Sequence, residues 1–209
     1  MPYASREGYG PNKVAAEQAL LSSGLPVTVV RPSKIHGEGA RPAREWVFVK
    51  RVLDRRPAVL LAHGGRGVDH PSAAVNIAAL VETVAARPGA RILNCADPDA
   101  PTGREIARAV AAHLGHDWRE VLLDDNADPA LGNHPWDRPH PVVLDITAAR
   151  ELGWIPVGTY AETVPATVDW LAGIALRTPP GAVLPPGWDG EVGEFDYARE
   201  DAFLRDAAR

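Results

Sequence analysis

Short runs of apolar and β-branched residues alternate with helical patterns along most of this chain. The clearest run, Leu25 to Val30, is nearly continuous, as in a parallel strand buried on both faces, and Arg31-Pro32 ends it. The apolar spacing over residues 11–22 predicts a helix immediately before this strand. Strands that alternate with helices are typical of an α/β fold with a parallel sheet.

The same alternation continues through the later part of the chain. Helices are predicted over residues 44–55, 72–86, 102–115, 145–151 and 159–171, and strands over 58–61 and 91–95. Residues 33–43 are predicted to form a loop and residues 64–67 a turn, because both contain several glycines or prolines. Ser72 is expected to begin its helix, and capping boxes are expected at Thr102 and Thr159.

The composition changes near residue 176. Residues 1–176 are predicted to form the globular domain, and residues 177–209 form a tail rich in proline, glycine and acidic residues. The tail also contains Trp188, Phe195 and Tyr197, which indicates that it packs on another surface.

Charge and cysteine content limit the partners and the compartment. The net charge is -5 and no basic run occurs, which argues against binding to nucleic acid or to anionic lipid. No apolar stretch reaches the roughly 18 residues of a membrane span, and the N-terminus lacks the pattern of a signal peptide. The single cysteine, Cys95, is expected to be a buried, inert thiol. These features predict a cytoplasmic protein.

Tyr9 and Lys13 are the strongest candidates for chemistry. They lie four residues apart at the start of the first predicted helix, so both side chains can reach one face. A nearby lysine cation favours the phenolate and lowers the pKa of a tyrosine, which would make Tyr9 a usable proton acceptor. The alternative is that the pair occurs by accident on a solvated helix.

The ordered segments around this pair resemble the extended short-chain dehydrogenases/reductases, which include the NAD-dependent epimerases and dehydratases. Residues 9–17 resemble the Tyr-x-x-x-Lys helix of that family, and residues 27–37 resemble its strand-Arg-Pro-x-x-x-x-Gly segment. Residues 145–171 are similar to its closing Leu-Gly-Trp-x-Pro region. The resemblance implies an α/β fold with a partial, doubly wound Rossmann-like sheet and the C-terminal substrate-binding lobe of the family.

The resemblance also implies roles for six residues. Tyr9 would be the general acid or base, and Lys13 would hold the nicotinamide ribose of NAD or NADP. Pro32, Ser33 and Ile35 match the segment that lies against the nicotinamide in relatives. Arg66 matches a position that often contacts the anionic part of the substrate, and the alternative is an ordinary surface arginine in a glycine-rich turn.

Two parts of the family's pattern have no counterpart in this sequence: the Gly-x-x-Gly-x-x-Gly turn that approaches the pyrophosphate, and the Ser or Thr well before the tyrosine. We therefore expect a chain that lacks the N-terminal dinucleotide-binding half. The strand that begins near Val27 would then have a bare edge. Such an edge predicts aggregation, a homodimer, or a requirement for a complementing N-terminal polypeptide.

Other chemistries are less well supported. His113, His116 and Asp117 lack a further ligand at a recognisable spacing, so no metal site is predicted, and the absence of Gly-x-Ser-x-Gly argues against an α/β-hydrolase. The sequence predicts an NAD(P)-dependent oxidoreductase or epimerase/dehydratase that acts at a carbinol or carbonyl carbon of a small molecule or sugar, inactive alone if truncated. The alternative is a non-catalytic interaction or regulatory remnant of the same family.

Overall fold

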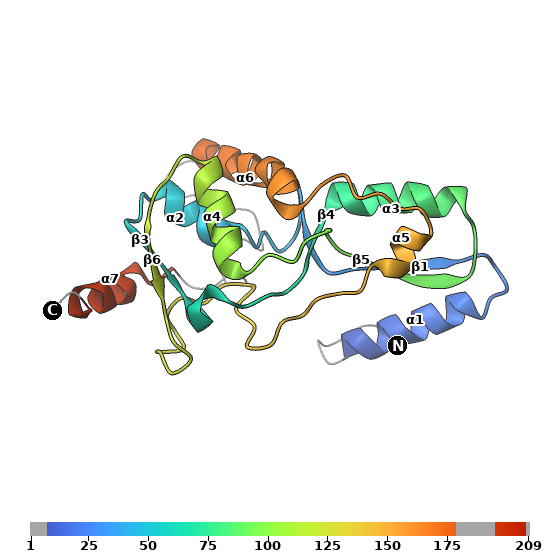
Figure 1. The fold of residues 1–209 in the computed structure, drawn as a ribbon, viewed down its shortest axis with the longest axis horizontal. Coiled ribbons are helices and arrows are strands. Elements are labelled where there is room, and N and C mark those ends of the chain that lie inside the picture. The colour runs from blue at the N-terminus through green and yellow to red at the C-terminus, as the bar shows by residue number, and fades with distance from the viewer. Residues whose placement is uncertain (1–7, 179–194, 208–209) are drawn as a thin grey trace.

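The structure is a computed structural model that describes residues 8–178 and 195–207. Helices and short strands alternate along it (Figure 1). The helices are α1 (Tyr9–Leu21), α2 (Trp46–Leu53), α3 (Ala74–Ala86), α4 (Gly103–His113), α5 (Thr147–Glu151), α6 (Tyr160–Arg177) and α7 (Tyr197–Asp206), with the 3-10 helix η2 (Ala62–Gly65). The strands are β1 (Thr28–Pro32), β2 (Lys34–His36), β3 (Ala58–Leu61), β4 (Pro71–Ala73), β5 (Arg91–Cys95) and β6 (Arg119–Leu122).

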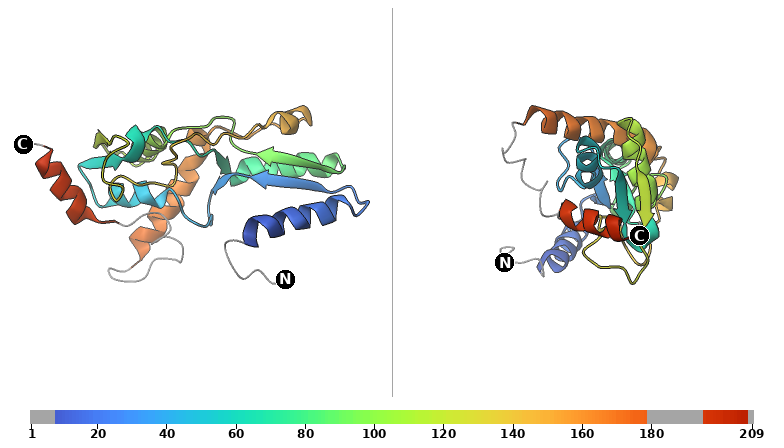
Figure 2. Two further views of the ribbon diagram at one scale, coloured as in Figure 1. Left: turned by 90° about the horizontal axis from the view of Figure 1, so that it is seen from below. Right: turned by 90° about the vertical axis from the view of Figure 1, so that its left-hand side faces the viewer.

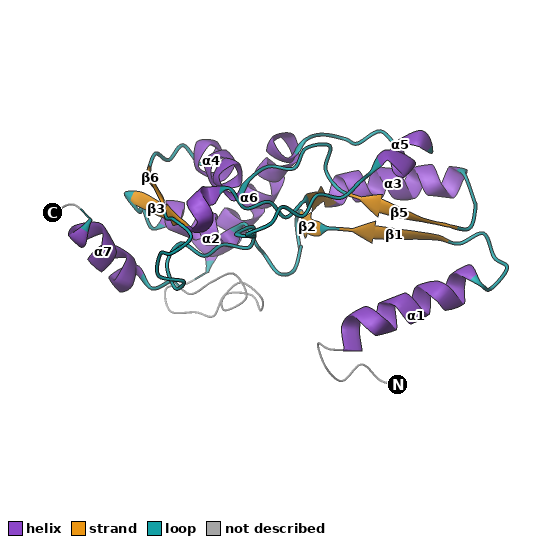
Figure 3. Cartoon of the chain, turned by 60° about the horizontal axis from the view of Figure 1, so that its bottom comes forward, coloured by secondary structure: helices purple, strands orange, loops and turns teal. Residues whose placement is uncertain are grey.

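The strands form three parallel pairs, β1 with β5, β2 with β4, and β3 with β6. Parallel neighbours need crossover connections, and helices occur in these connections. The β1–β5 pair lies near one end of the molecule with α3 and α5 on one side and α1 on the other (Figures 1 and 3). The β3–β6 pair lies near the opposite end with α2, α4 and α6. The predicted α/β fold with a partial parallel sheet is confirmed.

The prediction that the first strand is buried on both faces is wrong. Thr28, Val29 and Val30 are half-buried, and Arg31 and Pro32 are exposed. The helix α1 lies on one side of β1 (Figure 2). None of the described residues of α1 is buried, so this helix covers that face of the strand only partly. Among the described residues β1 pairs with β5 alone, so its other edge is open. The bare edge expected from the sequence is therefore present in the described part of the chain.

Two local predictions also need correction, and one strand was missed. Residues 34–36 form a strand inside the predicted loop, β6 was not predicted, and Ser72 belongs to β4 instead of beginning a helix. The Ser72 hydroxyl donates to the Cys95 carbonyl at 2.7 Å and accepts from the Ser33 backbone N–H at 2.9 Å. Its side chain thus joins neighbouring strands and does not cap α3, which begins at Ala74.

Two main apolar clusters hold the fold together. The larger is formed mainly by α2, β3, α4 and α6, and the smaller gathers Leu80, Leu93, Cys95, Ala149 and Trp154 around β5. Both predicted capping boxes are confirmed, because Thr102 and Thr159 each form one with the glutamate three residues later. None of the described helices combines the length and apolarity needed to cross a bilayer.

Cys95 is fully buried, as predicted. Burial and the charge of Asp97 raise the pKa of its thiol to about 12. Because the thiolate is the reactive species, iodoacetamide should leave Cys95 unlabelled in the folded protein at about pH 8 and label it fully in urea. Mass spectrometry of both samples measures this. Rapid labelling of the folded protein would contradict the burial of this side chain.

Candidate functional site

Five of the six predicted site residues line one cavity of about 420 Å³. The cavity lies where α1 faces the end of β1 and the start of β2. Its lining consists of Tyr9, Lys13, Glu17, Val30, Arg31, Pro32, Ser33, Ile35, Arg41 and Arg44. The carboxyl end of a parallel strand is where open α/β sheets usually bind ligands. The structure therefore gathers Tyr9, Lys13, Pro32, Ser33 and Ile35 at one position suited to a ligand.

Tyr9 and Lys13 lie on the first turns of α1. The Nζ atom of Lys13 lies 5.6 Å from the centroid of the Tyr9 ring. Tyr9 is 53% exposed, so a ligand in the cavity can reach its phenol. The pair combines a group that can exchange a proton with a cation that can donate hydrogen bonds.

The backbone of Ser33 is held firmly between strands. Its N–H donates to the Ser72 hydroxyl at 2.9 Å and to the Cys95 carbonyl at 3.2 Å. The following N–H, that of Lys34, donates to the His70 carbonyl at 3.2 Å. Residues alternate along a strand, so Ser33 and Ile35 face the cavity while Lys34 points elsewhere. The wall beside the cavity is thus fixed by contacts with residues far along the chain.

The cavity is strongly cationic. Lys13, Arg31, Arg41 and Arg44 line it together with one carboxylate, Glu17. The Arg31 guanidinium donates to Glu17, with its Nε atom 3.0 Å from Oε1, and this hydrogen bond lowers the pKa of Glu17. An excess of positive charge favours an anionic ligand.

Sequence reasoning did not select Arg41 and Arg44. Arg41 belongs to the loop predicted after the first strand, and Arg44 is the first residue of the helix predicted over residues 44–55, although in the structure it precedes α2. Arg44 donates from Nη1 to the Ile35 carbonyl at 3.3 Å, which turns its side chain back toward β2. The available signal was their position, since loops at the carboxyl ends of strands frequently carry binding residues.

Arg66 lies in a different cavity, of about 430 Å³, and the structure does not bring it to Tyr9. The residues around it are His63, Gly67, Asp125, Arg138, Pro139 and Pro141. The side chain of Arg66 is 72% exposed, and its Nη2 lies 3.4 Å from Asp125. His63, whose backbone has a left-handed φ of 52°, contacts the same carboxylate at 3.0 Å.

The buried carboxylate of Asp69 contacts one residue beside each of the two cavities. Asp69 accepts from Arg138 Nε at 2.8 Å and lies 3.2 Å from the Nζ atom of Lys34. Arg138 lines the cavity of Arg66, and Lys34 lies between Ser33 and Ile35 in the chain. Burial is the main cause that lowers the pKa of Lys34, and the charge of Asp69 opposes it.

A buried polar network joins β2, β4, α3 and the segment after β5. The Nε2 atom of His36 pairs with Asp97 at 2.8 Å. The other oxygen of Asp97 accepts from the Ala73 N–H at 2.6 Å and from the Asn76 amide at 2.8 Å. Asn76 in turn accepts from the N–H groups of Val157 and Gly158. The sequence reading missed this network, although Asn76 within an apolar helix and an aspartate just after a strand were available signals.

The histidines considered as metal ligands have other partners. His113 contacts Asp169 at 2.7 Å, and His116 contacts the Arg56 carbonyl at 2.9 Å. Within residues 8–178 and 195–207, no group of three or more His, Cys, Asp or Glu side chains is placed to hold a metal ion.

No protein-family model matches the chain, and no curated protein matches its sequence. Many solved structures share its fold. The UDP-glucose 4-epimerase of Thermotoga maritima, solved with UDP-glucose, has a TM-score of 0.61 at 20% identity over 79% of this chain.

Two further solved structures match over a slightly larger part of the chain. The dTDP-glucose 4,6-dehydratase of Bacillus anthracis, solved with NAD, has a TM-score of 0.60 at 18% identity and covers 84% of this chain. RMD from Pseudomonas aeruginosa, solved with NADPH, has a TM-score of 0.61 at 14% identity and covers 83%. This chain covers 53%, 55% and 58% of the epimerase, the dehydratase and RMD, respectively. It therefore spans little more than half the length of the proteins whose fold it shares.

Proposed function

We propose that this chain, which has the fold of the extended short-chain dehydrogenases/reductases, supplies the catalytic pair and the substrate lobe of an NAD(P)-dependent oxidoreductase or epimerase/dehydratase. The substrate would be a small molecule, such as a sugar nucleotide, that reacts at a carbinol or carbonyl carbon. The observation that carries the proposal is the shared cavity of Tyr9, Lys13, Pro32, Ser33 and Ile35. Solved proteins of this fold with NAD, NADPH and UDP-glucose support it.

The residues around the cavity fit the nicotinamide end of such a cofactor. Val30, Pro32 and Ile35 offer apolar surface to a flat ring, and Lys13 offers donors to ribose hydroxyls. In the described residues, no glycine-rich turn leads directly from a strand into a helix to receive a pyrophosphate. The cationic arginines Arg41 and Arg44 are suited to an anionic part of the cofactor or substrate.

In the proposed mechanism, Tyr9 exchanges a proton with the reacting oxygen of the substrate. Lys13 holds the ribose and keeps positive charge beside the phenol, since its Nζ lies 5.6 Å from the ring. A bound nicotinamide would supply or accept the hydride. The fixed backbone of Ser33 and the exposed side chain of Ile35 orient the ligand against the pair.

The open edge of β1 leads to a related proposal about partners. We infer that this edge pairs with a strand of a second polypeptide segment, either a complementing nucleotide-binding unit or another copy of this chain. Such a strand would lie beside the cavity, because β1 contributes Val30, Arg31 and Pro32 to its lining.

Titration calorimetry with NAD(H) and NADP(H) tests the proposed function. Lys13→Ala should weaken binding by roughly tenfold or more, because it removes hydrogen bonds from a charged group. Arg150→Ala, a charge removal on the exposed side of α5, is the control and should bind like the unmodified chain. Equal binding by Lys13→Ala would show that the cofactor does not use the cavity. No binding by the folded chain would instead mean that this chain alone is not an oxidoreductase, and the titration should then be repeated with a complementing nucleotide-binding unit.

A further inference from the structure

The C-terminal helix α7 docks on the end of the molecule farthest from α1 (Figures 1 and 2). Acidic side chains of α7 contact one arginine within α2 and one just after it. Arg51 donates from Nη2 to Glu200 at 2.5 Å, and Arg56 forms a two-pronged contact with Asp201. Arg51 and Glu200 are both almost completely buried, so this pair is shielded from solvent.

Aromatic residues at the start of α7 add a second set of contacts with the same cations. The guanidinium of Arg56 lies 4.3 Å from the centroid of the Tyr197 ring, and that of Arg51 lies 5.0 Å from the Phe195 ring. The Tyr197 hydroxyl donates to Asp54 at 2.6 Å. Cations over aromatic faces attract the rings, which orients the helix on α2.

The other face of α7 meets apolar residues of the β3–β6 region. Phe203 and Leu204 pack against a small cluster of Leu60, Leu123 and Leu131. Both α7 residues remain partly exposed, so their apolar contribution is limited. The docking of α7 therefore depends on charge as well as on apolar packing.

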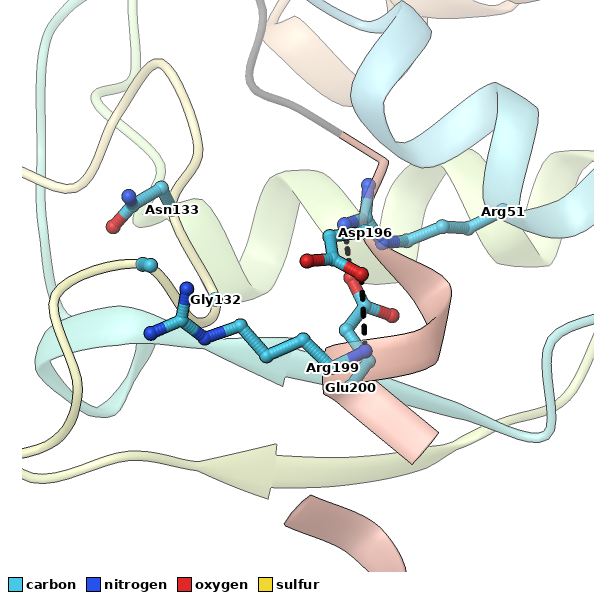
Figure 4. Close-up of a pocket in the computed structure, with 7 residues that line it drawn as sticks. Arg51, Gly132, Asn133, Asp196, Arg199 and Glu200 are labelled. Carbon is cyan, nitrogen blue, oxygen red and sulfur yellow. Dashed lines mark hydrogen bonds and ion pairs between the residues drawn. The ribbon is translucent and has the colours of Figure 1, made fainter. Parts of the chain in front are cut away.

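The helix also touches the segment that leads to the cavity of Arg66. Arg199 donates to Asp128 at 3.1 Å from Nε and at 2.5 Å from Nη2. Between α7 and residues 130–133 a small cavity of about 190 Å³ remains, bordered by Arg51, Asn133 and Asp196 (Figure 4). Residues 123–133 include Asp125, which contacts His63 and Arg66. The position of α7 is thus connected to that cavity through residues 123–133.

We propose that Arg51, Arg56 and the cluster of Leu60, Leu123 and Leu131 form an exchangeable docking site for a short acidic amphipathic helix with aromatic residues at its start. In this chain α7 occupies the site. A helix of 10 residues is marginal in water by itself, so α7 is helical when docked and unfolds when it leaves. Its departure frees residues 123–133 and loosens the wall of the cavity around Arg66.

Hydrogen exchange on the full chain is the first test. The double variant Glu200→Gln, Asp201→Asn should increase exchange of the amides in residues 198–206 and 123–133 by roughly tenfold or more, with α4 unchanged. The control Glu82→Gln, Glu151→Gln changes two exposed acids on α3 and α5 and should exchange like the unmodified chain. If residues 123–133 exchange equally in both variants, the proposed connection is wrong.

A labelled peptide of residues 195–207 tests exchange directly. By fluorescence polarisation, the full-length double variant should bind this peptide roughly tenfold or more tightly than the unmodified chain does, because its own α7 no longer fills the site. Added salt should weaken this binding. A folded double variant that does not bind the peptide would overturn the proposal.

If the double variant does not fold, hydrogen exchange of the unmodified chain at several salt concentrations still tests whether α7 can leave its site. Salt screens the part-exposed pairs of Arg56 with Asp201 and of Arg199 with Asp128, so raising its concentration should accelerate amide exchange in residues 198–206 well before it affects residues 104–113 of α4. Exchange of both helices at one common rate at every salt concentration would show that α7 is a permanent part of the core, and would overturn the proposal.

Discussion

Replacing Asp97 with alanine should lower the free energy of unfolding by about 3–5 kcal/mol, because three buried groups lose their hydrogen-bond acceptor at about 1–3 kcal/mol each. The carboxylate pairs with His36 and accepts hydrogen bonds from the Ala73 N–H and the Asn76 amide. Its removal leaves these groups buried without their acceptor. The Nδ1 atom of His36 has no hydrogen-bond partner among the described residues, so the ring has no second hydrogen bond that could compensate for the lost one.

Urea unfolding followed by circular dichroism measures this loss. Asp97→Asn should be less damaging than Asp97→Ala, because an amide oxygen can still accept from Ala73 or Asn76. Asp117→Ala is the matched control, since Asp117 is exposed, and its effect should stay within about 0.5 kcal/mol. Similar midpoints for Asp97→Ala and Asp117→Ala would mean that the network contributes little to stability.

Replacing Trp136 with alanine should also cost about 3–5 kcal/mol, because it removes a large side chain from the core. Trp136 is 1% exposed and stacks on Phe48 with ring centroids 6.0 Å apart. Its backbone carbonyl approaches Gly67 so closely that a Cβ atom there would lie 2.2 Å from the oxygen. The buried ring of Trp136 and its closely packed backbone hold this loop in place. The next residues of the loop, including Arg138, line the Arg66 cavity.

The unfolding midpoint in urea again gives the measurement, with Ile155→Ala as control. Ile155 is a large apolar residue that is 81% exposed, so its removal should change stability by no more than about 0.5 kcal/mol. Trp136→Phe should retain part of the stacking on Phe48 and fall between these two variants. Equal stability of Trp136→Ala and the control would contradict the packing described for this loop.

Local features were predictable from the sequence because neighbours in the chain produce them. The capping boxes at Thr102 and Thr159 depend on residues three positions apart, and both formed. Tyr9 and Lys13 share a helix because four residues make about one turn. Pro32, Ser33 and Ile35 could be selected because they lie at or just after the end of the strand that the apolar run predicts.

Contacts between distant residues required the tertiary structure. The strands β2 and β4 have three residues each, too few for a periodic signal, and they exist because they pair with each other. His36 and Asp97 are 61 positions apart, and nothing in the sequence around either residue identifies the other.

The predicted site residues are divided between two cavities because contacts between distant residues decide which side chains share a cavity. Local sequence patterns were enough to predict the alternation of helices and strands, the helix that carries Tyr9 and Lys13, and the segment that faces them. Only the tertiary structure added Arg41 and Arg44 to their cavity and assigned Arg66 to another. Local hydrogen bonding and periodicity determine where a helix or strand forms. The residues that a side chain contacts depend instead on how distant elements pack, which is a property of the whole chain.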